Sequence, residues 1–481
     1  MEDFSFVLKM SLSGSILFLI ICIFKLVIFK KSRKIVFCIS FIATMAFTST
    51  SVFAVNSIIK STEFAVFVST DGLYMSQLKE NNPVMLDKGE QIKLPIISRD
   101  GSYVAYIKND DLYACNIKTH EIEAVSKDIE SYDWDSKGDL IYSTKDKGII
   151  MYNTNTSKST NIISNEYKYY NINCDNKNKI YANKEYEYTK GDFLYGKALG
   201  IISYDLDSKS EKLILESKPS TNTKLDENST NAQILASLGS TPTVSQISND
   251  NKYIYIWNEP NSASTASDIT EFAVYDILNN KYIEFNNGDK DLDLENGSGI
   301  YALAYKDNIS QNPVNSNLIA LNAGTGRDMF SNKTLGILNT DNNTFTSLLP
   351  ENQVSMTPSY SEDGKNILYS GAEALNGKDV NSSLKTWQSQ PHNIYEVNTE
   401  TRKITQITNG KSFDFMPKYL LNNEILFVRG DGDSFSLWKT NDGVETKLGD
   451  SLSFNSGDEA YTDSWYYGHY KTEMVIDVFE K

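Results

Sequence analysis

A short motif recurs along this chain, and its recurrence restricts the fold more than any other feature of the sequence. Its clearest copy begins at Pro358 and reads P-S-Y-S-E-D-G-K-N-I-L-Y, and a second copy, P-I-I-S-R-D-G-S-Y-V-A-Y, begins at Pro95. Asp-Gly supplies the left-handed backbone of a hairpin turn, and apolar residues alternate on either side of it. Each copy therefore predicts a strand, a tight turn and a second strand.

Weaker copies of the motif begin at Trp134, Ser248 and Pro417. The spacing between equivalent apolar positions, Val68 and Tyr106, is 38 residues. A second apolar hairpin follows the first in most copies, so one period accommodates about four short strands. Repeats of this size that pack only on their neighbours are typical of a β-propeller, and radial repetition also suits a chain too long for one ordinary core.

We therefore predict an all-β chain whose main part is a seven- or eight-bladed β-propeller, with eight blades favoured. The predicted units span residues 62–89, 94–125, 130–162, 168–217, 244–285, 298–350, 357–408 and 413–450. Seven blades remain open because the insertions 218–243 and 286–297 have no clear place. The first insertion is expected to be a surface loop with a short helical core at 231–238.

The first unit lacks an innermost strand. The alternating apolar run at residues 473–480 (EMVIDVFE) can supply it. Such a closure would tie the two ends of the ring together and remove an exposed strand edge.

The repeated string P-x-aromatic-S-x-D-G-x-x-I-x-aromatic resembles the repeat of TolB-type propellers, which also occurs in the propellers of prolyl-oligopeptidase-like enzymes. The resemblance covers roughly residues 62–450. It implies a rigid ring that presents its central channel or its loops to a ligand.

Two apolar stretches, residues 11–29 and 35–55, precede the repeats and are separated only by K-K-S-R-K. Each is about long enough to cross a ~30 Å hydrocarbon core as a helix. Because so short a loop forces an antiparallel transmembrane hairpin, its basic residues stay cytoplasmic. We expect residues 1–55 to anchor the chain in the cytoplasmic or inner membrane and residues 56–481 to lie on the extracytoplasmic side. The second stretch also fits a signal peptide, and cleavage after Ala54 would give a secreted propeller.

The segment FSFVLKMSLSGSILFLIICIFKLVIFKK resembles the first transmembrane helix of membrane metallopeptidase receptors of the BlaR/MecR type. In that family a zinc protease domain with an H-E-x-x-H motif precedes the last helix and an extracellular sensor domain. This chain has no such motif. The resemblance therefore implies a receptor-like protein from which the protease domain is absent.

Charge and cysteine content restrict the partners and cofactors. Residues 1–54 carry six basic and two acidic residues, which leaves 40 basic and 60 acidic residues, a net charge of −20, for the remainder. Because a domain this acidic repels phosphate backbones, we expect no nucleic-acid partner. The sequence contains no C-x-x-C motif, so it gives no support for a zinc site. Cys115 and Cys174 are expected to be buried thiols, and their pairing depends on where the blades place them.

No motif predicts catalysis, so we expect no catalytic residues, no cofactor and no metal. The chain has three scattered histidines, His120, His392 and His469, and no G-x-S-x-G. The last unit also reaches close to the end of the given sequence, which leaves no room for an α/β-hydrolase domain. The acidic run at residues 289–295 departs from the calcium-loop template, and R-G-D at residues 429–431 reads as part of a turn. The five tryptophans are expected to pack between blades rather than form a sugar-binding surface.

Two functions follow from these expectations. The first is a membrane-anchored extracellular propeller that binds or senses a protein or cell-envelope ligand without turnover. The alternative is a propeller-type lyase or hydrolase on cell-wall polysaccharide, which would require carboxylates and a histidine from several blades to converge in the channel.

Overall fold

The computed structural model describes residues 63–479, apart from 80–81, 147, 191–192, 222–236, 238, 262–269, 286–298, 325–327, 332, 351, 376–379 and 455–463. Residues 64–480 form one compact unit. The two apolar stretches, the cleavage site after Ala54 and the receptor-like first segment all lie outside the described residues. No helix in the described part of the chain is both long enough and apolar enough to cross a membrane.

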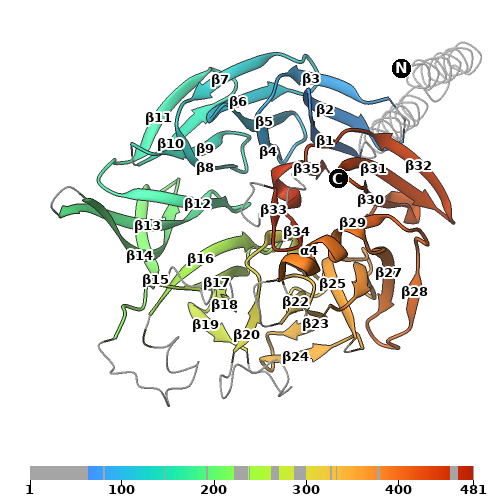
Figure 1. The fold of residues 1–481 in the computed structure, drawn as a ribbon. Helices are drawn as coiled ribbons and strands as arrows, with labels where there is room; N and C mark the ends of the chain where they lie inside the picture. Colours follow the sequence, from blue (N-terminus) through green and yellow to red (C-terminus); the bar gives the residue numbers. More distant parts are fainter. Residues whose placement is uncertain are drawn as a thin grey trace, which may run out of the picture. The chain divides into compact units, whose positions relative to one another are not determined.

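The described residues form an eight-bladed β-propeller, which confirms the all-β prediction and decides the blade number (Figure 1). Seven blades are four-stranded antiparallel sheets, and the fifth has an additional strand. The strands of each blade are given from the innermost outward. The first blade consists of β35 (Ile476–Phe479), β1 (Phe64–Ser69), β2 (Gly72–Gln77) and β3 (Val84–Lys88), and the second of β4 (Ile92–Ile97), β5 (Tyr103–Lys108), β6 (Asp111–Asn116) and β7 (Ile122–Ser126). The third blade consists of β8 (Ile129–Trp134), β9 (Leu140–Thr144), β10 (Ile149–Asn153) and β11 (Lys158–Ile163), and the fourth of β12 (Lys168–Cys174), β13 (Lys179–Lys190), β14 (Phe193–Asp205) and β15 (Ser210–Glu216). The fifth blade consists of β16 (Ser240–Ile247), β17 (Tyr253–Pro260), β18 (Thr270–Asp276) and β19 (Lys281–Glu284), and the additional strand β20 (Ile300–Ala302) also pairs with β18. The sixth consists of β21 (Ile309–Gln311), β22 (Leu318–Ala323), β23 (Thr334–Asn339) and β24 (Thr344–Ser347), and the seventh of β25 (Gln353–Tyr360), β26 (Asn366–Glu373), β27 (Asn393–Asn398) and β28 (Ile404–Gln406). The eighth consists of β29 (Phe413–Tyr419), β30 (Ile425–Asp431), β31 (Ser434–Asn441) and β32 (Val444–Gly449).

The ring closes as the sequence predicted. Strand β35 pairs antiparallel with β1, with Phe64 opposite Phe479 and Phe67 opposite Ile476. The rings of Phe64 and Phe479 also stack, with centroids 5.0 Å apart. The last strand thus completes the sheet of the first blade, and β1 has no free edge.

Two predicted boundaries were wrong. Residues 300–302, assigned to the sixth unit, pair with β18 and therefore belong to the fifth blade. Residues 240–243, assigned to the first insertion, begin the innermost strand β16. Both segments lie next to insertions, where the local pattern gives no information about which sheet a short strand joins.

The Ser-x-Asp-Gly part of the motif builds the same turn in several blades. In the seventh blade the Ser361 hydroxyl donates to Asp363 (2.8 Å) and accepts the backbone N–H of Asn366 (2.9 Å). Hydrogen bonds from the Ser361 hydroxyl and the Lys365 N–H hold the pKa of Asp363 below its ordinary value. Equivalent serine-to-aspartate bonds occur in the second and fifth blades. The repeat is therefore a turn that satisfies its own backbone donors.

One region of the core differs from ordinary contacts between blades. The helix α4 (Val380–Ser389) and a hairpin of β33 (Trp465–Tyr466) and β34 (His469–Tyr470) lie at the centre of the ring (Figure 1). Their buried aromatic side chains pack against those of the innermost strand β29. We call this cluster the aromatic plug; it comprises Phe330, Trp387, His392, Phe413, Phe415, Phe435, Phe454, Trp465 and Tyr470.

Candidate functional site

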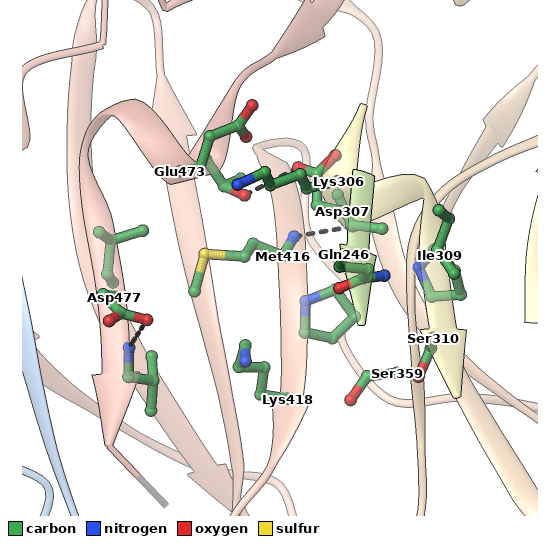
Figure 2. A pocket seen from close by; sticks show the side chains of 16 residues that line it. Gln246, Lys306, Asp307, Ile309, Ser310, Ser359, Met416, Lys418, Glu473 and Asp477 are labelled. Carbon is green, nitrogen blue, oxygen red and sulfur yellow. Dashed lines mark hydrogen bonds between the residues drawn. The ribbon is translucent and has the colours of Figure 1, made fainter. Parts of the chain in front are cut away.

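A cavity of about 310 Å³ lies among the innermost strands of the ring (Figure 2). Strands β16, β21, β25, β29 and β35 each contribute to its wall. Two short 3-10 helices, η3 (Lys306–Asn308) and η5 (Thr472–Met474), contribute three of its charged residues, and β29 and β35 contribute Lys418 and Asp477. Five blades thus bring residues that are distant in the sequence to one concave surface, the usual position of a propeller binding site.

Asp307, on η3, is held by two side chains from the C-terminal segment. The Nε2 of His469 lies 2.8 Å from one carboxylate oxygen, and the Thr472 hydroxyl donates to the other over 2.8 Å. The His469 ring is buried and stacks on Tyr305, with centroids 4.0 Å apart and ring planes 5° apart. Both oxygens of Asp307 therefore have a partner within the fold, which fixes the carboxylate in the cavity wall.

Glu473 lies beside this pair, on η5. One of its carboxylate oxygens, Oε2, is enclosed and has no hydrogen-bond partner among the described residues. Burial, and in second place the negative charge of Asp307, raise the pKa of Glu473 above its ordinary value. The positive charge of Lys306 acts in the opposite direction. Glu473 is therefore the acidic group of the cavity whose hydrogen-bonding capacity the fold leaves unused.

Two lysines also line the cavity. Lys306 is exposed, and the described residues give its ammonium group neither a hydrogen bond nor an ion pair. Lys418 lies on β29, lower in the view of Figure 2. Asp477, by contrast, accepts the backbone N–H of Ile97 over 2.8 Å and so joins β35 to the next blade. The cavity thus presents basic groups and one under-used acid, so it can bind a ligand with both acceptor and donor groups.

β-bulges in the innermost strands shape the wall. Thr357 and Met416 have left-handed backbone, with φ of 50° and 55°, and each precedes a proline. The pairing register shifts at both positions. The Met416 N–H that the bulge turns out of its own sheet donates to the Thr357 hydroxyl over 3.0 Å, which links two blades (Figure 2). A bulge re-aims backbone groups in this way, and Pro358 and Pro417, which follow these two bulges, line the cavity.

The residues considered in the sequence have other roles or lie outside the described part. Cys115 and Cys174 are buried and free, which confirms the thiol prediction. The acidic run 289–295 lies outside the described residues, as does the predicted helical core 231–238 except for Ser237. Elsewhere in the described ranges, no three His, Cys, Asp or Glu side chains are placed to hold a metal ion.

Arg429 of the R-G-D sequence is engaged within the eighth blade. Its guanidinium binds both oxygens of the fully buried Asp414, at 2.7 and 2.9 Å, and also Glu445. The turn itself falls at Gly432 and Asp433. Arg429, Gly430 and Asp431 themselves belong to β30, so the prediction that the R-G-D sequence is part of a turn was wrong, and the turn begins one residue later. Four of the five tryptophans are buried, but two of them, Trp387 and Trp465, pack in the aromatic plug and not between blades as predicted.

Sequence reasoning missed the residues that make up the cavity. Asp307 and His469 are 162 positions apart, and neither belongs to the repeated motif. The only signal for the wall was the proline of the repeat, because Pro358 and Pro417 both line the cavity.

No protein-family model matches this chain, and no curated protein matches it. Solved structures with a similar fold include TolB from Acinetobacter baumannii, which is 12% identical and for which the match covers 75% of this chain and 67% of that one, with a TM-score of 0.33. An oligogalacturonate lyase from Vibrio parahaemolyticus is 11% identical over 76% of this chain and 93% of that chain, with a TM-score of 0.41.

A dipeptidyl peptidase 4 from Porphyromonas gingivalis is 8% identical over 79% of this chain and 56% of that chain, with a TM-score of 0.47. This chain therefore spans little more than half the length of that peptidase. These structures are similar in fold alone, because identities near 10% carry no information about the site.

Proposed function

We propose that this protein is a non-catalytic binding or sensing module whose ligand, a protein segment or another cell-envelope component, enters the central cavity. The observation that supports this best is the state of Asp307. Both of its oxygens are bonded, to His469 and Thr472, so its carboxylate is part of the wall and not a free base. Lys306 and Glu473 remain to hydrogen-bond a ligand without turnover.

The proposal includes the location of the propeller. We propose that residues 11–29 and 35–55 form a transmembrane hairpin that holds residues 56–481 on the extracytoplasmic side, or that cleavage after Ala54 releases them. The support is the sequence: two apolar stretches around a basic loop. From the receptor-like first segment we further propose that the chain is a relative of BlaR/MecR-type receptors without the protease domain. Protease accessibility and N-terminal sequencing on intact cells test this part, and a propeller protected from external protease would contradict it.

The binding function is tested with the full chain, solubilised in mild detergent and immobilised. Cell-envelope extract is passed over it, and retained components are identified by mass spectrometry. Lys306→Ala and Glu473→Gln should each reduce retention at least tenfold, whereas Val314→Ala, a substitution of an exposed apolar residue (71% accessible), should leave it unchanged. Equal retention by all four proteins would contradict binding in the cavity.

One observation favours a second function, a lyase or hydrolase acting on cell-wall polysaccharide. Glu473 has a raised pKa beside the carboxylate of Asp307, and pairs of acids whose environments separate their pKa values perform acid–base chemistry in polysaccharide cleavage. Incubation of the full chain with purified wall polysaccharide, followed by analysis of released reducing or unsaturated ends, tests it. Release by the unmodified chain and not by Glu473→Gln would favour the enzyme over the binding module.

A further inference from the structure

The fourth blade carries a two-stranded arm that its sheet does not need. Strand β12 pairs with β13 only up to Glu185, and β15 pairs with β14 only from Gly200 onward. Residues 186–190 and 193–198 therefore continue as a ribbon of β13 and β14 alone, which extends away from the ring (Figure 1). An isolated two-stranded ribbon is at best marginally stable in water, so its persistence here calls for an explanation from its side chains.

Three tyrosines lie in a row on one face of this arm. Tyr188 pairs directly with Tyr195 across the ribbon, and Tyr186 is two residues before Tyr188 on the same strand. Their side chains remain 45%, 42% and 43% exposed for Tyr186, Tyr188 and Tyr195. Most other large aromatic side chains of the propeller are buried, so the arm is the place where the described chain gathers exposed aromatic rings.

The rings are nearly parallel to one another. The planes of Tyr186 and Tyr188 differ by 14° and their centroids are 6.3 Å apart, and the planes of Tyr188 and Tyr195 differ by 20° at 5.7 Å. Rings in full face-to-face contact would be roughly 3.5–4 Å apart. These rings are therefore offset from one another, and Tyr186 also contacts the ring of Tyr167, with centroids 6.1 Å apart.

The charge on the tyrosine face is positive, although the propeller as a whole is acidic. Lys197 pairs with Tyr186 across the ribbon, and Lys190 follows Tyr188 by two residues, so both lysines belong to the tyrosine face. Both are exposed. Glu187 alternates to the opposite face of the ribbon. The tyrosine face thus combines open aromatic rings with two cationic groups, and it selects an anionic partner.

We propose that the tyrosine face of the arm binds an anionic polysaccharide. The C–H groups on one face of a sugar ring pack against the electron-rich face of an aromatic ring, while its hydroxyl groups stay hydrated. A row of offset tyrosines offers this contact to successive sugar units, and Lys190 and Lys197 pair with their acidic groups. An acidic peptide has the charge but no repeated flat apolar face. The choice of a polysaccharide over a single-stranded nucleic acid, which also stacks on aromatic rings, rests on the extracytoplasmic location proposed above.

The test uses the full chain in mild detergent and isothermal titration with alginate oligosaccharides, which are uronic-acid chains. Tyr188→Ala should weaken binding at least tenfold, because it removes the central ring, whereas Tyr188→Phe should stay within about twofold. The double substitution Lys190→Glu with Lys197→Glu keeps every ring and should also weaken binding at least tenfold. Leu278→Ala removes an exposed apolar side chain (67% accessible) from another blade and should change nothing.

Three results would overturn the proposal. The first is an unmodified chain that does not bind alginate, or equal affinity in all variants. The second is equally tight binding of poly-glutamate, which would reduce the face to an electrostatic patch. The third is binding of a dT oligonucleotide without binding of alginate. If Tyr188→Ala disorders the arm, the affinity of the Lys190→Glu, Lys197→Glu variant for alginate tests the proposal in its place. A propeller protected from external protease would instead contradict the extracytoplasmic location. It would not change the measured affinity for alginate.

Discussion

The aromatic plug and the arm of the fourth blade use the same kind of side chain in opposite ways. In the plug, rings from α4, β29 and the β33–β34 hairpin are buried and pack in varied orientations, from edge to face between Phe413 and Tyr470 (88°) to stacked between Phe415 and Tyr470 (30°). In the arm, tyrosines pack nearly parallel to each other and stay more than two-fifths exposed. Burial of rings stabilises the propeller, whereas exposed rings contribute little to stability and remain available to a partner.

The largest effect expected from this difference is in the plug. Trp387 is fully buried, and its indole N–H donates to the Gly468 carbonyl over 2.7 Å, which ties α4 to the β33–β34 hairpin. Trp387→Ala should lower the free energy of unfolding by about 3–5 kcal/mol, because it leaves a cavity and an unpaired carbonyl. Urea denaturation followed by circular dichroism measures the change. A loss below about 1 kcal/mol would mean that the plug does not support the ring.

The second effect is a pH dependence confined to the plug. His392 is fully buried, and the loss of hydration lowers its pKa to about 3 although the Gln390 carbonyl contact acts against the shift. The folded state therefore keeps this histidine neutral while the unfolded chain protonates it below about 6.5. Stability should be fully present above pH 6.5 and fall as the pH decreases toward 3, by about 2–3 kcal/mol between pH 6.5 and 4.5.

Urea denaturation at several pH values tests the role of His392, with His392→Phe as the matched variant, because phenylalanine keeps the ring stacked on Phe413 and removes the titration. The slope between pH 6.5 and 4.5 should be shallower in His392→Phe. An identical slope in both proteins would assign the acid sensitivity to another group.

The third effect concerns the contact between the closing strand and its neighbour. Asp477→Ala removes the acceptor of the Ile97 N–H, a bond between residues 380 positions apart. The loss of an acceptor for a part-buried donor should lower the free energy of unfolding by about 1–2 kcal/mol. Asp477→Asn, which keeps an acceptor oxygen, should lose less. If the alanine and asparagine variants have the same urea midpoint, this bond contributes no stability.

The smallest effect is expected in the arm. Tyr188→Ala should change the free energy of unfolding of the propeller by no more than about 0.5 kcal/mol, as for most surface substitutions. The same variant should nevertheless lose polysaccharide binding. Thermal denaturation beside the titration separates the two readouts. A large loss of stability would show that the arm, like the plug, supports the ring.

The repeats predicted much of this fold because the information is local. The Ser-x-Asp-Gly turn is built from contacts within about five residues, and its copies were recognisable around Pro95 and Pro358. The closing strand was also predictable, since the incomplete first unit required a partner and one alternating run remained. The strand at residues 300–302 was not, because three residues carry no pattern that selects a sheet.

The residues of the cavity could not be predicted from the sequence, for a physical reason. Asp307 and Glu473 meet only because η3 and η5 follow irregular segments, and no periodicity places such segments in space. The arm was not predicted: the alternation Y-E-Y at residues 186–188 puts two rings on one face of a strand, but the register that adds Tyr195 to this face is known only from the structure. Their exposure, however, depends on where the neighbouring strands stop.

The pairing of β35 with β1 has a consequence for the order of events during synthesis. The first blade is translated early, yet its innermost strand emerges from the ribosome after all seven other blades. Until then β1 presents an unpaired edge to anything nearby, including β1 of another nascent chain. That edge therefore stays open to non-native strand pairing until residues 476–479 have been made and have paired with β1.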